Sequence, residues 1–174
     1  MKISMHAMTV DSFAPMLTSL SEILDKGEAY AKAKKLDLVD ARLAPDMYTL
    51  AQQVQQACHH AKDGAARLGG GQPVAIEDAR TTMTALKAQI AETLAFLRAF
   101  PAAAFDGSED RDCSIEIPGD MVIAMDGERF LRAWALPHFY FHVATAYDIL
   151  RHLGVEIGKK DYLSQAGGFI RPKV

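Results

Sequence analysis

The chain has 174 residues, of which 49% are apolar and 24% charged, and its net charge is −3 with histidine neutral. A chain of this size and composition can bury one contiguous core, so we expect one domain over residues 1–174. The basic residues are scattered among acidic ones, which argues against nucleic acid as a partner. We expect a cytoplasmic protein with no membrane partner, because no segment approaches the ~20 apolar residues that span a bilayer and residues 1–10 lack a signal-peptide pattern.

The first predicted helix has apolar residues at intervals of three and four from Phe13 to Leu24. This spacing places them on one side of an α-helix. Asp11 or Ser12 is expected to cap the helix, and Pro15 is tolerated within the first turn, where no intrahelical N–H bond is lost.

The second and third predicted helices cover residues 47–68 and 83–100. Asp46 is expected to cap the second helix, and three glycines at 69–71 are expected to end it. Several positions on its core side are small, and these alanines either bring neighbouring backbones together or leave room for a ligand. They are Ala57, Ala61 and Ala65.

The pattern then changes to alternation of apolar and polar residues over 113–117 and 121–125, separated by the turn residues 118–120. Alternation of this kind around a turn predicts a short β-hairpin. Asp126 is expected to cap a brief helix that Pro137 interrupts or restarts. The sequence therefore predicts an all-α four-helix bundle with a short β-hairpin between helices three and four.

The fourth predicted helix, 137–153, carries the main chemical signal, the pair His138 and His142. At 100° per residue both histidines lie on the same stripe as Thr145 and Ile149, so their rings are expected to point into the bundle. Two imidazoles one turn apart can reach one divalent ion. Buried imidazoles can also be ordinary core histidines with satisfied hydrogen bonds, so both interpretations stay open.

A metal site needs a third ligand, and the second helix offers Gln53 or His60. These two lie seven residues apart, a rise of ~10.5 Å, so both are not expected to reach one ion. His59 lies opposite the core side and is expected to be solvated. Cys58 and Cys113 have no CxxC spacing and are expected to be buried, reduced and unreactive.

Three segments carry a resemblance to a known family: RLAPDM at Arg42–Met47, the glutamine-rich start of the second helix, and LPHFYFHVATAYDILRHLGVEIGKKDYL at Leu136–Leu163. With these segments the chain resembles the DinB/YfiT-like superfamily, and more closely an uncharacterised bacterial family within it that is known only as a domain of unknown function. The resemblance covers nearly the whole chain and implies a bundle of up-down-down-up type.

The superfamily resemblance also implies a divalent metal, such as zinc or nickel, held by one histidine of the second helix and two of the last. The last-helix positions fall on His138 and His142, and the second-helix position falls near Gln53, with His60 as the other candidate. Relatives include thiol-dependent transferases and many homodimers. The resemblance thus implies a homodimeric, metal-dependent enzyme of thiol-transferase or hydrolase type, with no catalytic side chain assigned. The alternative is a non-catalytic bundle that binds a small molecule or a partner subunit without metal.

Overall fold

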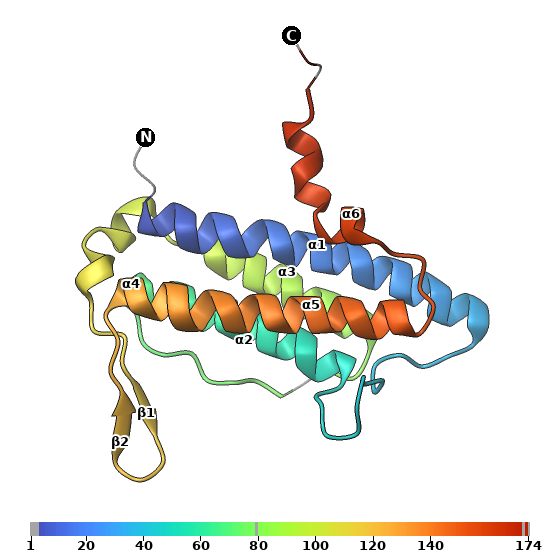
Figure 1. Cartoon of the computed structure of the whole chain (residues 1–174), viewed down its shortest axis with the longest axis horizontal. Helices are drawn as coiled ribbons and strands as arrows, with labels where there is room; N and C mark the ends of the chain where they lie inside the picture. Colours follow the sequence, from blue (N-terminus) through green and yellow to red (C-terminus); the bar gives the residue numbers. More distant parts are fainter. Residues whose placement is uncertain (1–3, 79, 172, 174) are drawn as a thin grey trace.

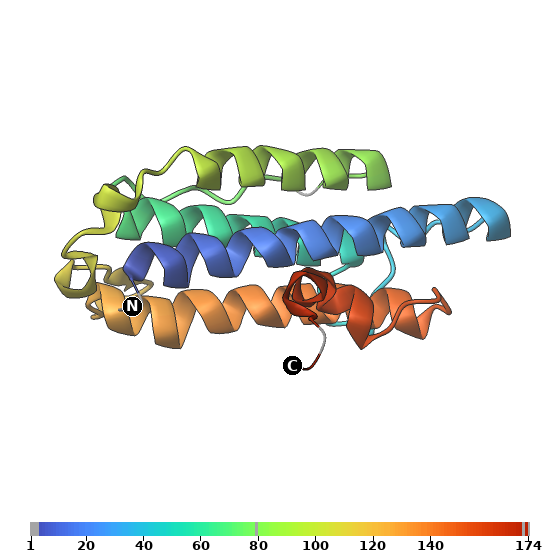
Figure 2. The ribbon, with the colours of Figure 1, turned by 90° about the horizontal axis from the view of Figure 1, so that it is seen from above.

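Four long helices form the body of the protein in the computed structural model, which describes residues 4–78, 80–171 and 173 (Figure 1). Helix α2 runs opposite to α1, α3 runs in the direction of α2, and α5 returns in the direction of α1 (Figures 1 and 2). The predicted up-down-down-up bundle is therefore confirmed. The four helices are α1 Met5–Lys34, α2 Leu50–Leu68, α3 Met83–Arg98 and α5 Leu136–His152.

The core lies between these helices, where α1 contacts α3 and α5, and α2 contacts the same two helices. Ala57, Ala61 and Ala65 of α2 are fully buried, and the ring of Phe13 lies against the backbone of Gly64. The alanines therefore serve close packing of helices rather than a ligand cavity. No helix among the described residues has the length and apolar character needed to cross a membrane.

Short elements connect α3 to α5. The hairpin pairs β1 with β2 in the antiparallel register Ile115↔Ile123 and Ile117↔Met121, as the alternation predicted. It projects from one end of the bundle, whereas the C-terminal segment projects from the opposite side (Figure 1). The short elements are η1 Ala102–Phe105, η2 Ser108–Asp110, β1 Ile115–Ile117, β2 Met121–Ile123, α4 Gly127–Phe130, η3 Leu131–Ala135, α6 Lys159–Tyr162 and η4 Ser164–Phe169.

Helix α1 begins earlier than its apolar pattern indicated. Ser4 is its N-cap and accepts a hydrogen bond from the backbone N–H of Ala7, so the predicted cap at Asp11 or Ser12 is wrong. Pro15 consequently lies inside the helix. The carbonyl left without its helical N–H partner belongs to the exposed residue Asp11, where water can satisfy it.

Helix α2 begins later than predicted, at Leu50 rather than after Asp46. Thr49 caps it through a reciprocal pair of hydrogen bonds with Gln52, in which each side chain accepts from the other residue's backbone N–H. This capping box satisfies two N–H groups at once, whereas an aspartate at position 46 would satisfy fewer. Residues 44–47 form a turn instead, closed by a hydrogen bond from the N–H of Met47 to the carbonyl of Ala44.

The helix before Pro137 is continuous with α5 rather than interrupted. Asp126 caps α4 as predicted, accepting from the N–H of Arg129, and η3 is a π-helical turn that leads directly into α5. Pro137 follows the π turn directly, and the carbonyls of Arg132 and Ala133 that an N–H at this position could reach belong to exposed residues, where water can satisfy them. The π turn thus accommodates the proline, and the helix continues without a break to His138.

Candidate histidine cluster

The four residues predicted for the site meet between α2 and α5. These helices run in opposite directions, so the earlier residue of α2 faces the later residue of α5 (Figure 1). Gln53 contacts His142, while the ring of His60 lies 4.7 Å from that of His138 and 5.5 Å from that of His142, between ring centroids. The antiparallel arrangement therefore brings both candidate third ligands to the histidines of α5: Gln53 contacts His142, and His60 lies beside both His138 and His142.

His142 is held by the side chain of Gln53. The distance from Nδ1 of His142 to Oε1 of Gln53 is 2.7 Å, and the two side chains are 7% and 1% exposed. The amide of Gln53 is itself oriented, because its Nε2 donates to the backbone carbonyl of Tyr48 at 3.4 Å. Its oxygen therefore faces His142 as an acceptor, which makes Nδ1 of His142 the donor.

His138 is held by the backbone of the π turn. Its Nδ1 lies 2.8 Å from the carbonyl oxygen of Trp134, and the two rings are 4.4 Å apart between centroids. A carbonyl only accepts, so Nδ1 of His138 carries the hydrogen. Both histidines of α5 thus have Nδ1–H engaged and Nε2 as the nitrogen with a free lone pair.

Burial disfavours the charged form of two imidazoles in the cluster, those of His60 and His142. It lowers the pKa of His60 to about 3, with the neighbouring His138 and His59 adding to the effect. It lowers the pKa of His142 to about 4, with His138 as the next cause. His60 and His142 are therefore uncharged near neutral pH, because a charged imidazole would lose its hydration at these two positions.

The arrangement fits a divalent metal in its chemistry more than in its geometry. Metal-binding histidines usually donate their other ring N–H to a carbonyl or carboxylate, as His138 and His142 do. However, the ring planes of His60 and His142 differ by only 8°, and those of His60 and His138 by 28°. Lone pairs in nearly parallel rings do not converge. Accordingly, no three histidine, cysteine, aspartate or glutamate side chains within the described part of the chain form a group that could hold a metal ion.

Two residues of the cluster were not found from the sequence. Trp134 lies four residues before His138, a spacing that would have indicated contact on a continuous helix. Tyr48 lies outside any helix, with its ring centroid 6.3 Å from that of His142, and no sequence pattern signals that contact. The carbonyls of both residues, rather than their side chains, orient the site.

The expectation for His59 is wrong, and that for Cys58 is confirmed. His59 is partly buried and its pKa is lowered by burial, because the segment after α2 folds back over that side of the helix. Cys58 and Cys113 are free and buried. Burial raises the pKa of Cys58 to about 12, which leaves the thiol unreactive near neutral pH.

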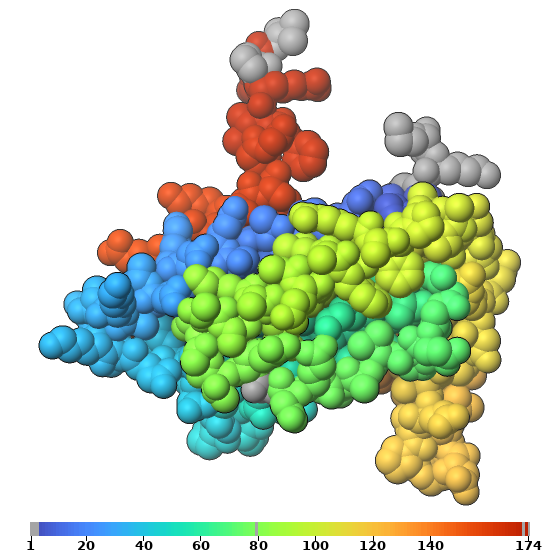
Figure 3. All heavy atoms as spheres, turned by 180° about the vertical axis from the view of Figure 1, so that it is seen from behind, coloured from blue at the N-terminus to red at the C-terminus, as the bar shows by residue number. Residues whose placement is uncertain are grey.

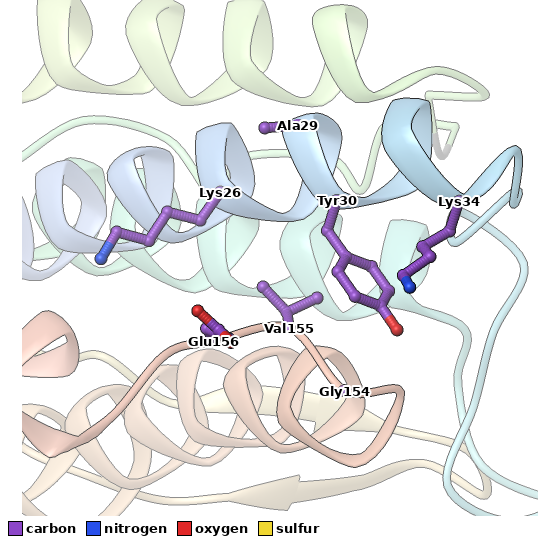
Figure 4. A pocket seen from close by; sticks show the side chains of 7 residues that line it. All are labelled: Lys26, Ala29, Tyr30, Lys34, Gly154, Val155 and Glu156. Atoms are coloured by element: carbon purple, nitrogen blue, oxygen red, sulfur yellow. The ribbon is translucent and has the colours of Figure 1, made fainter.

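An open groove of about 680 Å³ lies elsewhere, between α1 and the loop after α5 (Figure 4). Lys26, Lys34 and Glu156 line it together with Tyr30. The lining thus carries side chains of both charges, and Lys26 already pairs with Asp161 at 2.6 Å. The groove therefore does not select a ligand of one charge. The histidine cluster remains the stronger candidate site.

Comparisons with known proteins show the family to which this chain belongs. Residues 5–163 match the family described as "Domain of unknown function (DUF1993)". The chain belongs to this family. This DUF1993 protein is also similar to a solved structure, a DinB family member protein from Shewanella denitrificans, with 42% sequence identity and a TM-score of 0.82 over 91% of this chain and 90% of that chain. No curated protein matches this DUF1993 chain.

Proposed function

We propose that this DinB-like protein binds one divalent transition metal, such as zinc or nickel, at the cluster of His138, His142 and His60. The observation that carries the proposal is the pair of Nδ1 hydrogen bonds to carbonyl oxygens, at 2.7 Å and 2.8 Å. These bonds leave the lone pair of each Nε2 free to bind a metal.

Each group in this proposal has a distinct role. His138 and His142 are the metal ligands, and Gln53 orients His142 rather than binding the metal itself. His60 becomes the third ligand by turning its ring out of the parallel stack. A metal held by these residues would supply Lewis-acid chemistry and would lower the pKa of a bound water or thiol, as in a metal-dependent transferase or hydrolase.

A second function is favoured by the parallel rings. In this alternative the three imidazoles form a metal-free stack, in which Gln53 and Trp134 already satisfy Nδ1 of His142 and of His138. The protein is then a non-catalytic bundle that binds a small molecule or a partner subunit. The near-parallel planes, 8° and 28° apart, are what this alternative requires. It predicts that neither metal nor chelator changes the stability of the protein.

Metal analysis separates the two functions. Protein purified without an affinity tag is expected to contain close to one zinc or nickel per chain, and the His142→Ala variant almost none. His152→Ala, at the exposed end of α5, is the matched control and should keep its metal. Equal and negligible metal in all three proteins would contradict metal binding.

Thermal unfolding gives an independent measurement. A metal that binds only the folded state raises the thermal midpoint, so added zinc or nickel should raise it and a chelator should reverse the rise. The midpoint of His142→Ala should not respond. A wild-type midpoint that is also insensitive to both additions supports the metal-free stack.

A further inference from the structure

The described residues 72–78 and 80–82, here called the strap, lie between the end of α2 and the start of α3. The strap lies beside α3 on the face shown in Figure 3, where its atoms are green. Polar contacts attach it to α2: the Gln55 amide donates to the carbonyl of Glu77, and the N–H of Val74 donates to the carboxylate of Asp63 at 2.9 Å. Most of its residues are exposed, so apolar burial contributes little to holding it.

A small cavity lies between the strap and the two helices it crosses. The volume open to the centre of a water molecule is about 10 Å³, which is about what one water needs. The cavity therefore has room for one water and for no larger ligand. The residues that line it are Gln55, His59, Lys62, Val74, Ala75, Glu77 and Gln89.

Two polar atoms from this lining are buried without a hydrogen-bond partner among the described residues. They are Oε1 of Gln89, whose residue is only 1% exposed, and Nδ1 of His59. One comes from α3 and the other from α2. A buried polar group without a hydrogen-bond partner is costly, and one water molecule can supply a partner to both of these atoms.

We propose that this cavity is a specific binding site for one structural water that bridges His59 and Gln89 beneath the strap. The water donates one hydrogen to Oε1 of Gln89, which can only accept. It donates its second hydrogen to Nδ1 of His59 or accepts one from it, according to the tautomer.

The bridging water links α2 to α3 beneath the strap. It is separate from the proposed metal site, which lies on the α5 side of α2 around His60. The rings of His59 and His60 are 5.2 Å apart between centroids, so adjacent residues of one helix serve two different sites.

The substitution Gln89→Met tests the proposal, because the presence or absence of the water decides whether the thermal midpoint falls or rises. Methionine keeps the length of the side chain and removes the acceptor. With a bridging water present, the variant loses a satisfied hydrogen bond and its thermal midpoint should fall by about 2–8 °C. With a dry cavity, the variant removes an unsatisfied oxygen and the midpoint should rise, which overturns the proposal.

Two further measurements complete the test. Gln56→Met, at a partly exposed position of α2, controls for exchanging glutamine for methionine in a helix, and a midpoint for Gln89→Met equal to that control also overturns the proposal. A crystal structure of the wild-type protein at high resolution should show one water within hydrogen-bond distance of both atoms. A cavity without density, or direct bonding between the two side chains, overturns the proposal even if the variant does not fold.

Discussion

The hydrogen bond between Gln53 and His142 determines what the candidate site can do. Sequence reasoning placed Gln53 among the metal ligands, and the structure instead directs its oxygen to Nδ1 of His142 at 2.7 Å. An amide in this position fixes the tautomer and the orientation of the imidazole. Glutamine is therefore compatible with a metal site here as an orienting residue, although it is a poor zinc ligand.

Replacing Gln53 with leucine should lower the free energy of unfolding by about 1–3 kcal/mol. The variant leaves the buried Nδ1–H of His142 without an acceptor, and an unsatisfied buried donor carries this cost. Urea unfolding measures the change, with the partly exposed Gln56→Leu of the same helix as the control. Equal stability of the two variants would show that the pair contributes nothing.

The depressed pKa values make the fold sensitive to acid. The folded pKa of His60 is about 3 and that of His142 about 4, both below the ordinary value of 6.5, so the unfolded chain binds protons first as the pH falls. Their contribution to stability is complete above pH 6.5 and is lost as the pH falls through the folded values, at up to about 1.4 kcal/mol per pH unit for each group.

Urea unfolding of the wild type between pH 7 and pH 4.5 should therefore show a steady loss of stability. The His60→Gln variant lacks one of these groups and should show a shallower loss over the same range. His152→Gln, at the exposed helix end, serves as the control and should follow the wild type. A wild-type stability that does not change over this range contradicts the neutral, buried state of His60 and His142.

At the scale of elements, the segment α4–η3–α5 is the feature that positions the α5 histidines. The π turn places the carbonyl of Trp134 at Nδ1 of His138 and lets Pro137 enter a helix without breaking it. The alternation of the hairpin and the apolar spacing of α3 were sufficient to predict those elements. The starts of α1 and α2 were not predictable in the same way, because several polar residues near each start could serve as caps and only the folded chain selects one.

The start of α4 gives a sharp test of packing. A Cβ added to Gly127 would overlap the backbone carbonyl of Ser108 and contact the side chain of Leu68. Gly127→Ala should therefore lower the free energy of unfolding by about 2 kcal/mol, since backbone must move to make room. Gly167→Ala, where a Cβ meets nothing within 4 Å, is the control for the same exchange in chemical denaturation. Equal effects would contradict the close approach of η2 to α4.

At the scale of the whole molecule, the hairpin and the C-terminal segment extend from the bundle. Self-association of the protein stays a prediction of the family resemblance. We propose that the C-terminal segment takes part in it, because Phe169 and Ile170 are 83% and 84% exposed on an arm that leaves the body (Figure 3). Adjacent apolar side chains with this exposure are typical of contact surfaces.

Light scattering after size exclusion measures the oligomeric state directly. The wild type is expected to be a dimer, and a variant with Phe169→Ser and Ile170→Ser is expected to be a monomer. Met121→Ser, in the other projecting segment, is the control and should remain dimeric. A monomeric wild type, or a dimer unaffected by the double substitution, contradicts the proposal.

The sequence by itself determined the helical bundle, the hairpin and the inward direction of His138 and His142, because these follow from local periodicity and turn residues. Only the tertiary structure decided what the histidines meet. The antiparallel packing of α2 against α5 selected Gln53 as the partner of His142 and placed His60 beside both rings, and the strap buried His59. Those contacts depend on the relative shift of helices distant in sequence, which no local pattern specifies.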